Sequence, residues 1–168
     1  MSSADNITYN SDTNFTEVMR ATAMDVKQFK TNICSNFFKW YSSFHPLTPR
    51  RDQFDILDHL ASAPSVFLIK LLENGAYEYR LQGEGIVKLV GRRSQGKVFS
   101  SLCNDEDLSR FAMYLDEIVS TKGAFHSYGN LTAHNRHDLE FEALDFPLVN
   151  TDDKITHILG VMSLVPPN

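Results

Sequence analysis

Two glycine-containing motifs are the first candidates for chemistry in this chain. Gly83-Glu84-Gly85 begins like a dinucleotide-binding fingerprint, in which glycines let the backbone approach a pyrophosphate. The third glycine would fall at Lys88, and no parallel strand-helix-strand unit is predicted around the motif. Gly91-Arg92-Arg93-Ser94-Gln95-Gly96 differs by one residue from the Gly-x-Ser-x-Gly elbow of hydrolases. We interpret it as a glycine-bounded loop, in which Arg92 and Arg93 are candidates to hold an anion or a partner's carboxylates.

One pair of histidines has a spacing that a metal site would use. His134 and His137 are three positions apart in a predicted turn, and His126 or Asp138 would join them only if the strands converge. A metal site needs three or four ligands, so we interpret the pair as polar turn residues and predict no metal site. The sequence holds no Cys-x-x-Cys-His motif, which excludes covalent attachment of a c-type haem.

Carboxylates on a predicted strand near the carboxyl end are candidates for acid-base chemistry. They are Asp145, Glu140 and Glu142, and Asp145 shares a strand face with Phe141 and Ala143. A carboxylate buried in an apolar pocket can act as a general base. This leaves one enzymatic alternative, a small cone-shaped α+β protein of the isomerase or dehydratase type.

The composition is that of a single soluble globular domain. The chain has 168 residues, of which 42% are hydrophobic and 22% charged, and this predicts one packed core. A net charge of −5 argues against nucleic acid as a partner. No apolar run is long enough to span a bilayer, and the amino end lacks the basic start and apolar stretch of a secretory signal. We therefore expect a cytoplasmic protein.

The first quarter of the chain divides into a tail and a helix. Residues 1–13 are mostly polar and predict a disordered tail. Residues 14–44 predict an N-terminal helix with an aromatic stripe, ended by Pro46. The stripe is expected to pack on its own domain or, as the alternative, to form the seam of a homodimer. Its members are Phe29, Ile33, Phe37, Trp40 and Tyr41.

Residues 45–168 predict the main domain, where the apolar period changes from helical to alternating after Pro64. An Asn74-Gly75 turn between two alternating runs predicts a β-hairpin. Short helical turns follow, and then a longer helix that begins at Asp105 or Asp107 and ends at Lys122-Gly123. The last third predicts three strands. The five expected strands are residues 65–72, 77–82, 124–132, 139–149 and 154–165.

This order of elements predicts an α+β fold, with one five-stranded antiparallel sheet and its helices on one face. Such a sheet can leave an apolar cavity where its aromatic side chains meet short, glycine-broken helices. The alternative is a fully packed core. The candidate residues of the cavity are Phe67, Tyr79, Tyr114, His126 and Tyr128.

The sequence resembles a PAS domain, and more narrowly the single-domain PAS family common in alphaproteobacteria. One departure is Ile56, where that family tends to carry a proline after the aspartate. The resemblance runs from about Phe37 to Leu164 and is carried by Trp40, residues 49–55, 77–83 and 89–97, Phe146-Pro147-Leu148 and Ile158-Leu159-Gly160.

The resemblance implies a sheet in the order 2-1-5-4-3 and a non-enzymatic sensory or adaptor module of signal transduction. The expected cavity would take a small apolar or mixed-polarity ligand, the resemblance implies a signalling protein partner as the other possibility, and we expect a homodimer. Flavin-binding photosensory relatives carry a reactive cysteine after a Gly-Arg-Asn start, whereas here Ser94 follows Gly91-Arg92-Arg93. The long predicted helix has no histidine to hold haem. Flavin and haem are therefore not supported, and any cofactor is unknown.

Overall fold

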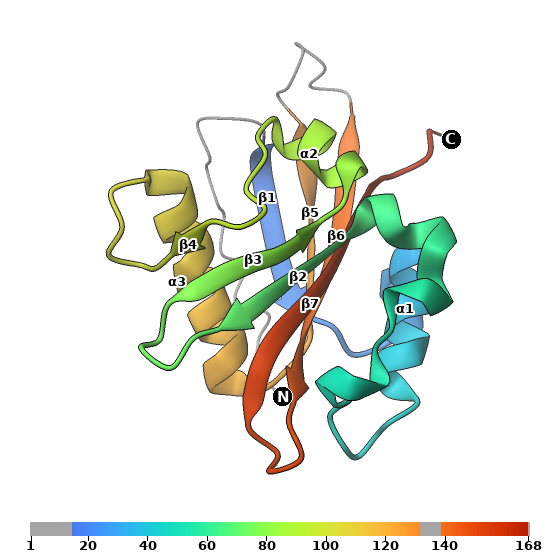
Figure 1. The fold of residues 1–168 in the computed structure, drawn as a ribbon. Coiled ribbons are helices and arrows are strands. Elements are labelled where there is room, and N and C mark those ends of the chain that lie inside the picture. The colour runs from blue at the N-terminus through green and yellow to red at the C-terminus, as the bar shows by residue number, and fades with distance from the viewer. Residues whose placement is uncertain (1–14, 132–138, 168) are drawn as a thin grey trace.

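A single β-sheet lies at the centre of the molecule, with a helical layer on each face (Figure 1). This computed structural model of the chain describes residues 15–131 and 139–167. Neighbouring strands are all antiparallel, in the order β1-β5-β6-β7-β2-β3-β4. The strands are β1 (Phe15–Thr22), β2 (Val66–Leu71), β3 (Tyr77–Gln82), β4 (Val98–Phe99), β5 (Phe125–Leu131), β6 (Glu140–Val149) and β7 (Ile155–Leu164).

The sheet has seven strands, so the predicted count of five and the predicted full order were wrong. The five expected strands lie side by side as β3-β2-β7-β6-β5, and the two additional strands extend the sheet at its edges. Strand β4 has only two residues, too few to produce a recognisable alternating pattern. It pairs with β3 through Val98 and Phe99.

Strand β1 lies in the segment that was predicted as the beginning of a helix. It pairs with β5, with Thr22 opposite Phe125 and Arg20 opposite Ser127. A free edge of β5 would present unpaired N–H and C=O groups, and this pairing satisfies them. The hydrogen bonds of this pairing therefore determine that residues 15–22 form a strand, although their apolar residues have a weak helical spacing. The predicted tail, residues 1–13, lies outside the described residues.

Helical elements cover both faces of the sheet, where the sequence predicted helices on one face only. One layer holds α1 (Asn32–Ser42) and the 3-10 elements η1 (Val26–Gln28), η2 (Arg51–Gln53) and η3 (Ile56–Ser65). The other holds α2 (Glu84–Val90) and α3 (Glu106–Thr121). The physical reason lies in β6, which is buried on both faces from Phe141 to Val149 and so needs cover on both sides.

The aromatic stripe that was offered as a dimer seam packs on the protein's own sheet. Phe37 is buried, and Phe29, Ile33, Trp40 and Tyr41 are partly buried against the same core cluster. The rings of Trp40 and Tyr41 lie 6.0 and 4.8 Å from the ring of Phe146 on β6. The intramolecular alternative therefore describes this face of α1. A dimer through the stripe would require α1 to leave the sheet.

Helix α3 begins and ends at the predicted residues. The Asp105 carboxylate accepts a hydrogen bond from the Leu108 backbone N–H at 3.1 Å, as an N-cap does. Lys122, with φ of 55°, ends the helix in the left-handed region. At 16 residues it is the longest helix described, and no helix within 15–131 and 139–167 is long and apolar enough to cross a bilayer.

Gly160 on β7 is a position where only glycine fits. A Cβ atom there would lie 2.0 Å from the ring of Phe67 and 2.4 Å from Oδ1 of Asp145. We therefore expect Gly160→Ala to lower the free energy of unfolding by about 1–3 kcal/mol, measured by urea denaturation. Gly123→Ala is the matched control, because its nearest neighbour would be Thr121 Oγ1 at 3.7 Å. Equal stability of the two variants would contradict this packing.

Candidate functional site

A cavity of about 130 Å³ lies between the sheet and the layer formed by α2 and α3. An engineered cavity of similar volume, about 150 Å³, holds a benzene molecule. Three of the five residues that the sequence predicted for a cavity line it. These are Phe67 of β2, Tyr79 of β3 and Tyr114 of α3.

The aromatic side chains that line the cavity form a continuous group. Phe111 of α3 stacks on Tyr79 at 5.9 Å and contacts the edge of Phe67 at 6.0 Å between ring centroids. These rings come from three different elements, and the 3.6-residue period of α3 brings Phe111 and Tyr114 to the face that meets the sheet. Burial raises the pKa of the Tyr79 and Tyr114 hydroxyls, so both remain protonated at neutral pH.

His126 and Tyr128 do not line this cavity. Successive residues of a strand point to opposite faces, and on β5 it is Ser127 that faces the cavity. His126 and Tyr128 face the other side, where they border an open groove of about 710 Å³ beside η1. The prediction selected the wrong face of β5, because the alternation alone does not say which face meets the cavity.

The cavity contains one buried carboxylate, Asp145 of β6, which is 3% exposed. The Tyr114 hydroxyl donates a hydrogen bond to its Oδ2 at 2.5 Å. Its other oxygen, Oδ1, has no hydrogen-bond donor among the described residues. Burial raises the pKa of Asp145 from 3.8 to about 7, although the bond from Tyr114 and the charge of Arg20 act in the opposite direction.

Strand β1 contributes residues to this wall that the sequence analysis missed. Val18 and Arg20 both line the cavity, and the Arg20 guanidinium lies over the Tyr114 ring, 3.5 Å from its centroid. The signal that would have found them is their spacing of two residues, which places both on one face of a strand. A helical interpretation of residues 14–44 hides this spacing.

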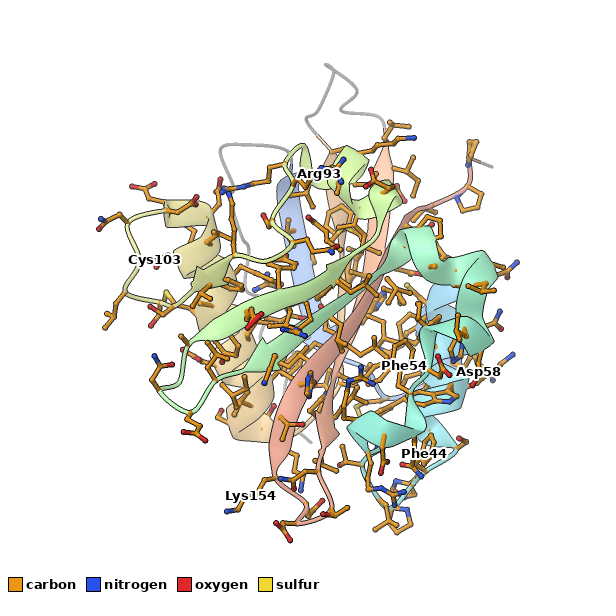
Figure 2. All side chains as sticks on the ribbon, viewed as in Figure 1. Phe44, Phe54, Asp58, Arg93, Cys103 and Lys154 are labelled. Atoms are coloured by element: carbon orange, nitrogen blue, oxygen red, sulfur yellow. The ribbon has the colours of Figure 1, made fainter. Side chains whose placement is uncertain are left out.

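The two arginines proposed for anion binding are both paired within the chain. Arg92 lines the cavity and forms two hydrogen bonds with the Asp105 carboxylate, at 2.7 and 3.2 Å. This contact lowers the pKa of Asp105 to about 2. Arg93 pairs with Glu84, and Figure 2 shows it beside α2, at the end of the molecule opposite Lys154. Neither guanidinium is therefore an uncompensated charge that awaits an anion.

The other two strand carboxylates lie outside the cavity. Glu140 is half exposed and lies 3.4 Å from the Lys30 ammonium. Glu142 is 1% exposed, and its side chain projects from the face of β6 opposite to that of Asp145. Of the three candidates for a buried base, the cavity therefore contains Asp145 alone.

Glu142 instead connects the sheet to the beginning of α1. Its carboxylate accepts hydrogen bonds from the backbone N–H groups of Lys30 and Thr31, at 2.8 and 2.9 Å, and from the Thr31 hydroxyl at 2.7 Å. His126 Nε2 lies 3.0 Å from its Oε2. Burial alone would raise the pKa of Glu142, but these hydrogen bonds outweigh it and lower the pKa to about 2. We name this set of contacts the Glu142 clamp.

The motif Gly83-Glu84-Gly85 serves packing. A Cβ atom on Gly83 would lie 2.3 Å from the Pro64 carbonyl oxygen, so the glycine allows α2 to begin directly against the end of η3. His134 and His137 lie outside the described residues. Within the described ranges, no three His, Cys, Asp or Glu side chains are grouped as metal ligands would be.

Comparison with known families identifies the class. The sequence model of the PAS domain matches residues 35–163, which is most of the chain, and the chain therefore belongs to the PAS domain family. PAS domains are in general non-enzymatic sensory and signalling modules. No curated protein and no solved structure matched the chain.

Proposed function

We propose that the chain is a cytoplasmic PAS sensory module that holds a small ligand in the cavity beneath α3 and signals through a partner chain. The observation that carries this proposal is the cavity itself, with aromatic walls and one buried carboxylate. Binding sites for small molecules are typically apolar with a few placed polar groups. A packed core without a ligand would gain nothing from burying Asp145, because an ionised carboxylate away from water is destabilising.

Strand β6 offers a physical route from the cavity to the opposite face of the sheet. Asp145 faces the cavity, while Glu142 and Phe146 on the same strand contact the α1 layer. A ligand that moves Asp145 thus acts on the strand that holds both the beginning and the aromatic face of α1. A ligand shifts a conformational equilibrium only when it binds one arrangement better than another. We propose that the position of α1 on the sheet is that equilibrium.

A variant with a filled cavity tests the proposal. Ala143 is buried and lines the cavity between Phe141 and Asp145, so Ala143→Leu places a larger side chain in the ligand's space. Native mass spectrometry of the full chain purified from its host should show wild type with an additional small mass and Ala143→Leu without it. Ala61→Leu, at an exposed position on η3, is the control and should retain the bound small molecule. Wild type without any retained mass, or retention by all three proteins, would contradict the proposal.

A second candidate function is favoured by the state of Asp145. A buried carboxyl group with a pKa of about 7, bonded to a tyrosine hydroxyl, has the properties of a general base. The two functions differ in what happens to the bound molecule. If the retained molecule is incubated with the protein in D₂O and recovered without deuterium on carbon, the chain is a receptor; deuterium uptake that Asp145→Asn abolishes would identify an enzyme.

The homodimer remains a proposal with its own test. Since the aromatic stripe of α1 is covered by the sheet, we expect the assembly to use surfaces other than this stripe. Sedimentation velocity of the full chain measures the assembly directly. A dimer that persists after Phe37→Ala, a substitution in the buried part of the stripe, would agree with a contact elsewhere.

A further inference from the structure

The wall around Asp145 defines the chemistry of the ligand more narrowly, if the proposed function is correct. Oδ2 of Asp145 is occupied by the Tyr114 hydroxyl. Oδ1 is buried and lies against Gly160 beside the ring of Phe67. A buried carboxylate oxygen without a hydrogen-bond donor is destabilising. A molecule in the cavity that donates to Oδ1 removes that penalty.

The charges around the carboxylate favour a neutral donor. The Arg20 guanidinium lies over the Tyr114 ring and already lowers the pKa of Asp145 through its charge. Arg92 lines the same cavity. Because Arg92 is already paired with Asp105, the cation nearest to the carboxylate is Arg20. A hydroxyl group also loses less free energy than an ammonium group when it leaves water for a largely apolar cavity.

The remaining walls determine the shape of the ligand. The volume of about 130 Å³ fits a molecule of benzene size. Phe67, Tyr79 and Phe111 form one aromatic wall, which suits a flat aromatic or compact alicyclic body.

We propose that the cavity binds a small neutral molecule with one apolar ring and one hydroxyl group, and that this hydroxyl donates a hydrogen bond to Oδ1 of Asp145. Tyr114 is then a positioning residue, because its own hydroxyl orients the carboxylate without touching the ligand's donor. The ring of the ligand lies against the aromatic wall that Phe67, Tyr79 and Phe111 form.

Phenol and toluene form the matched pair of probes, because they have nearly the same size and differ by a hydroxyl in place of a methyl group. We expect the full chain at pH 8 to bind phenol at least about fivefold more tightly than toluene, measured by NMR titration. Asp145→Leu removes the acceptor and should reverse the order. The double variant Asp145→Leu/Tyr114→Phe replaces both hydrogen-bonded partners by apolar groups, so it keeps the measurement possible if the single variant does not fold.

Each other outcome has a distinct meaning. Anisole, which accepts but does not donate, should bind no better than toluene; if it exceeds phenol, Asp145 acts as the donor and the proposal is wrong. If benzylamine binds more tightly than phenol, the proposal that the ligand is neutral is wrong. If phenol and toluene bind equally, the proposed hydrogen bond from the ligand's hydroxyl is wrong, and the rest of the proposal stands. Failure of every probe, together with no retained mass in wild type, would overturn the proposed function as well.

Discussion

The free energy of unfolding of Asp145→Asn, compared with that of wild type, should increase between pH 4 and pH 8. Burial raises the pKa of Asp145 from 3.8 to about 7 in the folded state, so folding binds a proton between these values. Wild type therefore loses stability as the pH rises through this window, by about 4 kcal/mol in total. Asparagine does not ionise, and the difference between the two proteins should change by this amount, in favour of the variant at the higher pH.

The measurement is urea denaturation of both proteins at pH 4, 6 and 8. The charged and titratable groups around Asp145 include Arg20 of β1, Tyr79 of β3, Arg92 and Tyr114 of α3. They are unchanged in the variant, so their effects cancel in the difference. The amide oxygen of the introduced asparagine can still accept the hydrogen bond from Tyr114. A difference in stability that stays constant from pH 4 to pH 8 would mean that Asp145 has an ordinary pKa and is not desolvated.

Glu142→Gln has the opposite dependence on pH. The hydrogen bonds of the Glu142 clamp lower its pKa from 4.5 to about 2 in the folded state, so the ionised carboxylate contributes stability above pH 4.5 that is lost as the pH falls towards 2. We expect the variant to be less stable than wild type by about 3 kcal/mol at pH 7, and this deficit to fall by roughly half at pH 3.

Glu140→Gln is the matched control for this experiment, since it removes a half-exposed carboxylate from the same strand. Surface substitutions of this kind change stability by about 0.5 kcal/mol or less. An equal effect of the two substitutions, or a deficit of Glu142→Gln that is independent of pH, would contradict the clamp. Amide exchange at Thr31 and Cys34 should increase in Glu142→Gln, because both lie where the clamp holds the beginning of α1.

Local patterns predicted the elements of the fold well where one rule dominated. The alternation of Tyr77 to Gln82 and the caps of α3 at Asp105 and Lys122 are set by neighbouring residues, and the structure has them there. Strand β1 depends on a partner more than a hundred residues away, which no local period can reveal. Leu81 and Tyr79 are two residues apart on β3, yet an irregularity in the β2–β3 pairing turns Leu81 towards the opposite core cluster, which strand alternation does not predict.

The candidate site was predictable in its aromatic part and not in its polar part. The sequence selected Phe67, Tyr79 and Tyr114, which line the cavity. Strand alternation alone could not decide the side of Phe67, since β2 is buried on both faces. His126 was assigned to the cavity, but it belongs to the Glu142 clamp on the other face. That clamp joins Thr31 to a residue 111 positions away. Such a contact depends on how the sheet is assembled, so local sequence patterns do not predict it.

The fluorescence of Trp40 tests the central claim most directly. It is the one tryptophan of the chain, and it lies on α1 with its ring 6.0 Å from Phe146, on the face of the sheet opposite the cavity. If occupancy of the cavity shifts α1, saturating phenol should change the emission of Trp40 in wild type and in Ala61→Leu, but not in the cavity-filled Ala143→Leu. Emission that stays constant while NMR shows phenol bound in the cavity would contradict a sensory role.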